Sequence, residues 1–226
     1  MMIGLILLLI TVGVYRGSKT VYAIHQRIYL SPLLVVPTIL IAILLLFGIS
    51  YPDYQTGGQW LTRLLGPATV AMAVPLHKNF DLLLKHKAAI LTGVASGAVL
   101  AVLSSAGLAL MFGLSREIVL SIAPRSVTTP IAINIAEMVG GNETLAAVFV
   151  IMTGLIGIVI GPLLISRLRI ESSVAKGLLL GMGAHGCGIS KALELGEEEG
   201  AIASLAMIIT AGSTLFIAPV FLSLIK

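Results

Sequence analysis

Apolar side chains fill long stretches of this 226-residue chain, and polar residues gather in the short segments between them. Four apolar runs approach or exceed the roughly 20 residues that a helix needs to cross a bilayer. They cover residues 33–49, 88–112, 145–165 and 201–224. The runs lack the period-two alternation of membrane-barrel strands. The pattern predicts an all-α polytopic membrane protein of about seven or eight helical segments, some of them broken.

Composition strengthens this prediction. Hydrophobic residues make up 58% of the chain and charged residues 11%, with a mean hydropathy of +1.08, whereas a soluble domain carries about a quarter charged residues. The single cysteine, Cys187, excludes an intrachain disulfide, and no metal-ligand spacing, phosphate loop or nucleophile–base pair is found. We therefore expect no enzyme activity, metal or cofactor. The net charge of +4 comes from short loops and does not indicate a nucleic-acid partner.

Lysine and arginine form three clusters between the apolar runs, and their positions predict the orientation of the chain. The clusters are Arg16, Lys19 and Arg27; Lys78, Lys85 and Lys87; and Arg167, Arg169 and Lys176. Basic loops stay in the cytoplasm, so all three are predicted to lie inside. Residues 50–60, which have no lysine or arginine, and residues 196–200 are predicted to lie outside. The first apolar segment, residues 3–15, is short for a span, and its crossing stays open.

Under this orientation, residues 117–141 must begin and end on the same side. The run at 88–112 leads outward, and the run at 145–165 must start outside so that it can end at Arg167 and Arg169. One straight crossing cannot satisfy both conditions. The segment is therefore predicted to be a re-entrant hairpin, a helix that breaks at depth and folds back.

The break of this hairpin falls in residues 122–132, IAPRSVTTPIA. A residue before proline avoids helical backbone angles, so the first half-helix is predicted to end near Ala123, ahead of Pro124. Pro130 suits the first turn of a second half-helix with Thr129 as its N-cap. The result is helix, break, helix.

The residue types in this break favour a bound anion. The free N–H groups at the start of the second half-helix and the guanidinium of Arg125 both attract negative charge. An arginine at bilayer depth costs about 2.5 to 3.5 kcal/mol on insertion scales, which favours a functional role. Arg125, Ser126, Thr128 and Thr129 are the candidate residues for a carboxylate. In the alternative interpretation, Arg125 pairs with Glu137 or a backbone carbonyl and serves helix packing.

A second break is predicted in residues 181–194, GMGAHGCGISKALE, because Gly181, Gly183, Gly186 and Gly188 weaken the helix there. Three of these glycines spell the dinucleotide fingerprint G-x-G-x-x-G, but that motif must follow a strand, so no nucleotide is predicted. His185 can bond a ligand or take up a proton near neutral pH, and the alternative is a structural histidine. Ser190 is a further candidate binding residue.

A third break lies at residues 66–78, where Gly66 and Pro67 open a helix and Pro75 interrupts it. We expect it to set backbone geometry only. The breaks at residues 66–78 and 181–194 occupy equivalent places, since each follows one long apolar run and precedes another. They would enter the membrane from opposite sides, as in an inverted repeat. The chain is thus predicted to be one membrane domain, residues 1–226, with repeat halves at about 31–113 and 142–226 joined by the re-entrant segment 117–141.

Smaller features are given structural roles. The glycine pairs Gly93/Gly97 and Gly157/Gly161 are spaced for close helix packing. Asn142 is expected to cap a helix, although N-E-T also matches a glycosylation site. Lys191 and Glu194 should pair at i, i+3. The acidic run at residues 197–199 is expected to be a solvated outer loop.

The three breaks carry a resemblance to a known family. LGPATVAMAVPL, PRSVTTPIA and GMGAHGCGISKALELGEEEGAIASLAM resemble signature segments of the LrgB/CidB family, and the similarity runs from about residue 31 onward. They are also similar to the C-terminal half of the plastidal glycolate/glycerate translocator. The family commonly has lysine in place of Arg125, often has an aromatic residue in place of His77, and usually has small residues and threonine where this chain has Cys187, Ile189 and Ser190.

The resemblance implies two functions. One is a carrier for small monocarboxylates of the pyruvate, glycolate, glycerate or lactate class, working with a separate LrgA/CidA-like small membrane protein. The alternative is an antiholin-like or holin-like modulator of murein hydrolase export and autolysis. Both belong in a bacterial cytoplasmic membrane. Three broken helices favour the carrier, because a simple pore does not need them. The residues leave open the substrate, the coupling ion and whether the chain forms a homo-oligomer.

Overall fold

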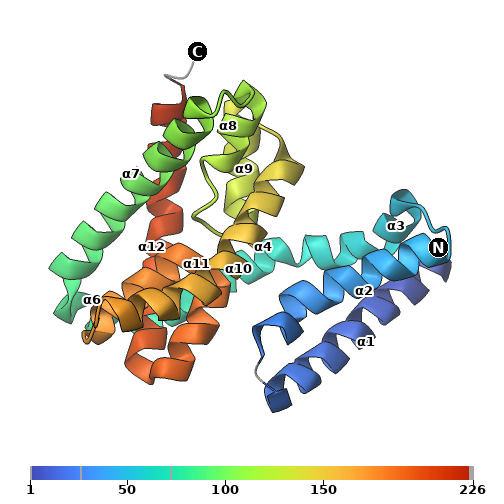
Figure 1. The fold of residues 1–226 in the computed structure, drawn as a ribbon, viewed down its shortest axis with the longest axis horizontal. Helices are drawn as coiled ribbons and strands as arrows, with labels where there is room; N and C mark the ends of the chain where they lie inside the picture. Colours follow the sequence, from blue (N-terminus) through green and yellow to red (C-terminus); the bar gives the residue numbers. More distant parts are fainter. Residues whose placement is uncertain (1, 26, 72, 224–226) are drawn as a thin grey trace. The chain divides into compact units, whose positions relative to one another are not determined.

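The computed structural model describes residues 2–25, 27–71 and 73–223. These residues form helices and short connections without a strand, as the predicted all-α class requires. Four helices are long and apolar enough to cross a membrane: α1 (Met2–His25), α7 (Lys87–Met111), α10 (Glu143–Arg167) and α12 (Glu197–Leu222) (Figure 1). The chain divides into two compact units, Met1–Val70 and Ala71–Lys226, and each is described by itself.

The first unit holds α1, α2 (Pro32–Leu46), α3 (Tyr51–Arg63) and most of α4 (Leu65–Ala71). Helix α1 continues through its polar residues to His25, so the segment predicted to be short is long enough to span. Conversely, α2 has only 15 residues and ends before Gly48, whose φ is +61°, so the predicted 33–49 span is shorter than expected. The stretch predicted to face outside is helical from Tyr51 and packs on α1, with Gly57 against Gly4.

The third predicted break appears at the boundary between the units. Gly66 and Pro67 lie in the first turn of α4, as expected for residues that open a helix. Helix α4 ends at Ala71, and α5 (Ala73–Lys78) begins two residues before Pro75, on the far side of position 72, which is outside the described residues. Helix α6 (Phe80–Lys85) then leads into α7.

The second unit alternates long helices with helical hairpins. Hairpin one consists of α8 (Arg116–Ile122) and α9 (Thr129–Val139), which lie side by side next to the end of α7 (Figure 1). Its two ends are tied together, because the Asn142 side-chain amide donates to Glu117 Oε1 at 3.0 Å and the Asn142 backbone N–H donates to Ser121 Oγ at 2.7 Å. The ends of the predicted re-entrant segment therefore meet, and Asn142 caps α10 as predicted.

Hairpin two is α11 (Ser173–Leu195), which reverses direction at His185. His185 has φ 51° and ψ −129°, far outside the helical region. A Cβ atom on Gly188 would overlap the carbonyl oxygen of Leu180, although eight residues span about 12 Å along a straight helix. Leu180 also shares a hydrophobic cluster with Ala192. The chain therefore turns back on itself within the glycine-rich stretch where a break was predicted.

This reversal corrects the predicted position of residues 196–200. Glu198 Oε1 lies 3.9 Å from His86 Nε2, and Glu199 Oε1 lies 3.9 Å from Lys176 Nζ. Residues 196–200 thus lie at the same end as the basic residues that were predicted to be inside, so the predicted placement of the two on opposite sides is wrong. The acidic run is also the first turn of α12 rather than a loop, and Glu199 is buried. The error came from treating the glycine-rich segment as a full crossing.

The two hairpins enter the second unit from opposite ends. The base of hairpin one adjoins the first residue of α10, and the base of hairpin two follows its last residue. The 25 residues of α10 span roughly 37 Å, which separates the bases by about the thickness of a bilayer. The predicted repeat halves stay a prediction, since residues 31–113 contain parts of both units.

The predicted close helix packing is confirmed at both glycine pairs. Gly157 and Gly161 of α10 face Ala184 and Leu180 of hairpin two, and a Cβ atom at either position would crowd these residues. On α7, Gly93 and Gly97 face Leu178 and Met182. The small residues let the broken helix approach its neighbours, so Ala184 and His185 at the tip of hairpin two are buried.

The hairpins predict a specific labelling pattern. In a Cys187→Ser background, single cysteines at Arg116 and Glu143 should react with an impermeant thiol reagent on intact cells. Cysteines at Glu171 and Glu197 should react only after permeabilisation, because the basic end faces the cytoplasm. Opposite accessibility within either pair would show a straight crossing in place of that hairpin. All four positions are exposed, so burial does not limit the reaction.

The tight turn of hairpin two predicts a matched pair of glycine variants. Gly188→Ala should lower the free energy of unfolding by about 1 to 3 kcal/mol, because the added methyl group overlaps the backbone at Leu180. Gly186→Ala, two residues away, meets no atom within 4 Å and should be tolerated. Thermal unfolding of the detergent-solubilised proteins measures both. Equal melting temperatures for the two variants would contradict the fold-back of α11.

Candidate functional site

The tip of hairpin one, residues 123–128, carries the predicted arginine. Helix α8 ends at Ile122, as the proline at position 124 predicts, and the chain turns before α9 begins. The N-cap of α9 is Thr128 and Pro130 is its second residue, so the predicted N-cap at Thr129 was one position too late. Thr128 adopts the extended backbone of an N-cap, but its hydroxyl makes no capping hydrogen bond.

Arg125 is held by one side-chain contact from α7. Its Nε donates to Ser105 Oγ at 2.7 Å, and Ser105 Oγ in turn donates to the carbonyl of Ala101 at 2.6 Å. Ser105 is 3% exposed, so this anchor is shielded from solvent. A guanidinium has five N–H donors, and the contact uses only the one on Nε. The planar fork formed by the two terminal nitrogens is left for other acceptors.

The tip of hairpin two, residues 184–186, lies next to that of hairpin one. The imidazole of His185 faces the backbone of Ser126 and is close enough to Arg125 for their charges to interact. Helix α10 gives independent evidence: its Val150 shares a cluster with Val127, and its Gly154, one turn later, faces Cys187. The two tips are thus about one helical turn apart along α10. The structure brings Arg125, Ser126 and His185 together, as the sequence predicted.

The charge at this junction is uncompensated. Within the described part of the chain, no carboxylate lies within 4 Å of Arg125. Glu137, the alternative partner, is exposed, and Glu117 is engaged by Asn142 at the hairpin base. The alternative interpretation of an Arg125–Glu137 pair is therefore wrong. A half-buried positive charge beside the start of a helix, with free donors, is an arrangement that favours an anion.

The remaining predicted residues divide into two groups. Thr128 is buried with an unpaired hydroxyl, and Ser126 and Thr129 are half-buried in the same tip. Ser190 is exposed, and its hydroxyl bonds back to the Gly186 carbonyl at 3.4 Å, so the structure does not bring it to Arg125. Nearby, Lys191 and Glu194 form the predicted ion pair.

Sequence reasoning missed three residues of this interior: Ser105, Thr210 and Thr214. Thr210 and Thr214 of α12 are 1% and 2% exposed, and their hydroxyls have no partner among the described residues. Their spacing of four residues inside an apolar run was a usable signal, because it puts both on one helix face. No three His, Cys, Asp or Glu side chains in the described residues are grouped as metal ligands.

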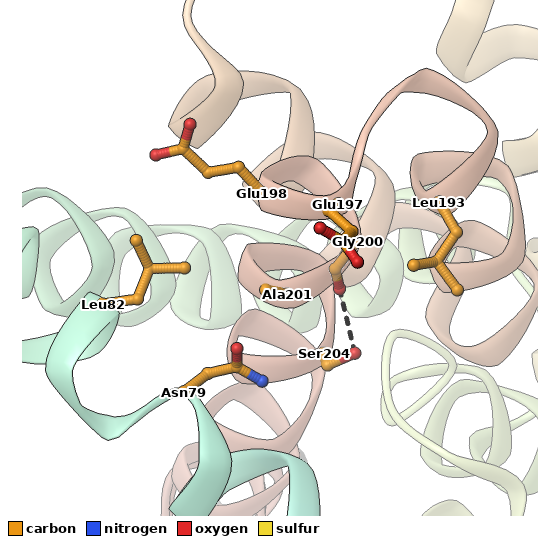
Figure 2. Close-up of a pocket in the computed structure, with 8 residues that line it drawn as sticks. All are labelled: Asn79, Leu82, Leu193, Glu197, Glu198, Gly200, Ala201 and Ser204. Carbon is orange, nitrogen blue, oxygen red and sulfur yellow. Dashed lines mark hydrogen bonds between the residues drawn. The ribbon is translucent and has the colours of Figure 1, made fainter.

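A groove of about 540 Å³ lies away from the tips, at the base of hairpin two. Figure 2 shows Glu197, Glu198, Ser204 and Leu193 on one side and Asn79 with Leu82 on the other. Because two carboxylates line it and none of the tip residues does, the groove is a poor place for an anion. We therefore place the candidate site at Arg125, between the hairpin tips, and not in this groove.

Fold and site together define an all-α, multi-pass membrane protein with two opposed helical hairpins whose tips meet at a half-buried arginine. The LrgB-like family model matches residues 11–224, and the chain belongs to this family. It is 48% identical over 223 residues to the uncharacterized protein YwbG of Bacillus subtilis, with 99% of both chains covered. It is 36% identical over 221 residues to the holin-like protein CidB of Staphylococcus aureus, covering 98% of this chain and 96% of CidB.

YxaC of Bacillus subtilis is similar as well, at 39% identity over 217 residues, which cover 96% of this chain and 94% of YxaC. No solved structure matches the chain significantly. The family match confirms the resemblance drawn from the three breaks. With four long apolar helices, membership of this family makes the chain a multi-pass protein of the cell membrane.

The anchor of Arg125 predicts the effect of removing one hydroxyl. Ser105→Ala should lower the free energy of unfolding by about 1.5 to 3 kcal/mol, because a buried hydrogen bond to a charged group is lost. Ser104→Ala, on the exposed face of the same helix, should change it by less than about 0.5 kcal/mol. Chemical denaturation of the purified proteins compares them, and an equal response would mean that Ser105 does not hold the guanidinium.

Proposed function

We propose that this protein carries small monocarboxylates across the cell membrane, and that the substrate binds where the two hairpin tips meet. The observation that supports this most directly is Arg125, a half-buried arginine without a carboxylate partner in the described residues. Broken helices that point their ends at a central site are a feature of secondary transporters. The family resemblance supplies the substrate class: pyruvate, glycolate, glycerate or lactate.

In this proposal the carboxylate is bound by hairpin one. The terminal nitrogens of Arg125 form two parallel hydrogen bonds to it, and Ser126, Thr128 and Thr129 add donors at the start of α9. His185 of hairpin two bonds a 2-oxo or 2-hydroxy group or relays a proton. Ser190 is left out of the contact set because its hydroxyl is turned to its own helix.

A separate LrgA/CidA-like membrane protein is the proposed partner, as the family resemblance implies. The chain has apolar side chains in plenty on its outer faces, such as Leu100 on α7 and Val220 on α12, and these suit either lipid or a partner helix. Transport by this chain alone and with its partner is therefore part of the same test.

The second candidate function is a holin-like or antiholin-like role in murein hydrolase export and autolysis. The name of the CidB relatives, holin-like protein, favours it. A holin-like pore needs a water-lined path between subunits but no preformed anion site. The two candidates therefore differ in what they require of Arg125.

Arg125→Gln should weaken carboxylate affinity about tenfold to a hundredfold, since a charge-assisted hydrogen bond to a buried group contributes about 1.5 to 3 kcal/mol. Arg125→Lys should be milder because it keeps the charge. Arg116→Gln removes the same charge from the exposed base of hairpin one and should leave affinity unchanged. Concentration-dependent uptake of labelled pyruvate and glycolate into proteoliposomes, with and without an LrgA-like partner, gives these affinities.

Three outcomes separate the candidates. Saturable uptake that Arg125→Gln weakens, and Arg116→Gln does not, supports the carrier and the site. Equal uptake by Arg125→Gln and the parent chain keeps the carrier but removes Arg125 from it. No saturable uptake under either condition, together with leakage of an unrelated dye, favours the holin-like role.

A further inference from the structure

Two threonines of α12 are buried without a hydrogen-bond partner in the described residues. Thr210 and Thr214 are at least 98% buried, yet neither hydroxyl makes a hydrogen bond within the described residues. Thr128 and His185, which belong to the hairpin tips, share this property. An unpaired buried hydroxyl is costly, so the position of these two groups calls for a physical reason.

Other helical threonines of the chain bond to their own helix backbone, which Thr210 and Thr214 do not. Thr11, Thr92 and Thr153 each donate to the carbonyl four residues earlier, at 2.8, 2.6 and 2.7 Å. This bond to the helix backbone is the usual way to satisfy a hydroxyl in an apolar helix. Thr210 and Thr214 are more deeply buried but make no such bond. Their hydroxyls are therefore available to a partner other than their own helix.

The contacts of α12 place both threonines at the level where the hairpins meet. Before them, Ala203 shares a cluster with Leu180 of hairpin two. After them, Ala211 shares a cluster with Val127 at the tip of hairpin one, and Ala218 with Ala123. Helix α12 thus passes hairpin two first and hairpin one next. The change from one to the other falls between residues 203 and 211. Thr210 lies within this interval, and Thr214 lies about one turn further along, between the two residues that pack at the tip of hairpin one.

We infer that Thr210 and Thr214 complete the binding site from α12 and bind an oxygen of the substrate other than those of its carboxylate. The inference rests on the proposed function. Arg125 provides a fork for one carboxylate, which leaves these hydroxyls to a second polar group of the same small molecule. A hydroxyl both donates and accepts, so the pair suits a 2-oxo as well as a 2-hydroxy oxygen. The nearby positive charge argues against a cation at the same place.

The pair should therefore decide selectivity between carboxylates. A site whose buried hydroxyls bind a substrate oxygen disfavours an analogue without that oxygen, because the hydroxyls then stay unpaired. Propionate has the carbon skeleton and carboxylate of pyruvate but no oxygen at C2. The parent chain should prefer pyruvate, and replacing threonine with the isosteric valine should remove this preference without changing the size of the site.

The test measures binding of pyruvate and of propionate to the full-length purified protein by ligand-dependent thermal stabilisation. Thr210→Val and Thr214→Val should weaken pyruvate binding about fivefold to tenfold each and leave propionate binding within about twofold. Thr153→Val, which removes a hydroxyl already bonded to its own helix, is the matched control and should leave both unchanged. Arg125→Gln should weaken both ligands alike.

The outcomes distinguish this inference from the proposed function. If the parent chain binds pyruvate and the α12 variants bind it equally well, the inference is overturned and the carrier stands. Equal losses for pyruvate and propionate in the α12 variants would also overturn it, since they indicate a general packing role. If neither carboxylate stabilises the parent chain, the proposed function fails, and the role of the threonines fails with it.

Discussion

A helix break inside a membrane exposes backbone groups that hydrocarbon cannot satisfy, and this constraint governs the second unit. The chain breaks twice at depth, at residues 123–128 and at His185. Each break can persist only where protein surrounds it. Helix α10 meets this requirement for both, because Val150 packs with one tip and Gly157 with the other. The breaks are next to each other because one helix covers the two of them.

The charged groups of the second unit differ between the hairpin tips and the hairpin bases. Three acidic groups have polar neighbours at the hairpin bases: Glu117 accepts from Asn142, Glu199 lies near Lys176, and Glu198 lies near His86. Arg125, at the centre, has only a serine. The bases are therefore stabilised by local pairs, while the centre keeps a net positive charge. Placing an arginine charge at bilayer depth costs free energy. A pore of low selectivity does not require this charge, whereas a site for an anion does.

The sequence predicted the parts of this arrangement that depend on local chemistry. Pro124 ended a helix where expected, the glycines around His185 marked a break, and the spacing of basic residues required the first hairpin. Whether the second break is a kink or a full reversal could not be predicted, because it depends on Gly188 packing on Leu180. Thr210 and Thr214 escaped notice because isolated threonines are common in membrane helices and only their missing bonds set them apart.

The distribution of satisfied and unsatisfied groups bears on how a ligand would act. A ligand shifts a conformational equilibrium only through contacts that differ between the two states. At the hairpin bases, Asn142 and Lys176 already contact acidic side chains, so a ligand gains little there. At the tips, the Thr128 hydroxyl and His185 Nε2 belong to separate hairpins, and neither has a hydrogen-bond partner in the described residues. A molecule that binds both groups links the two hairpins through them. Its binding energy therefore depends on how closely the tips approach, which couples occupancy of the site to the position of the hairpins.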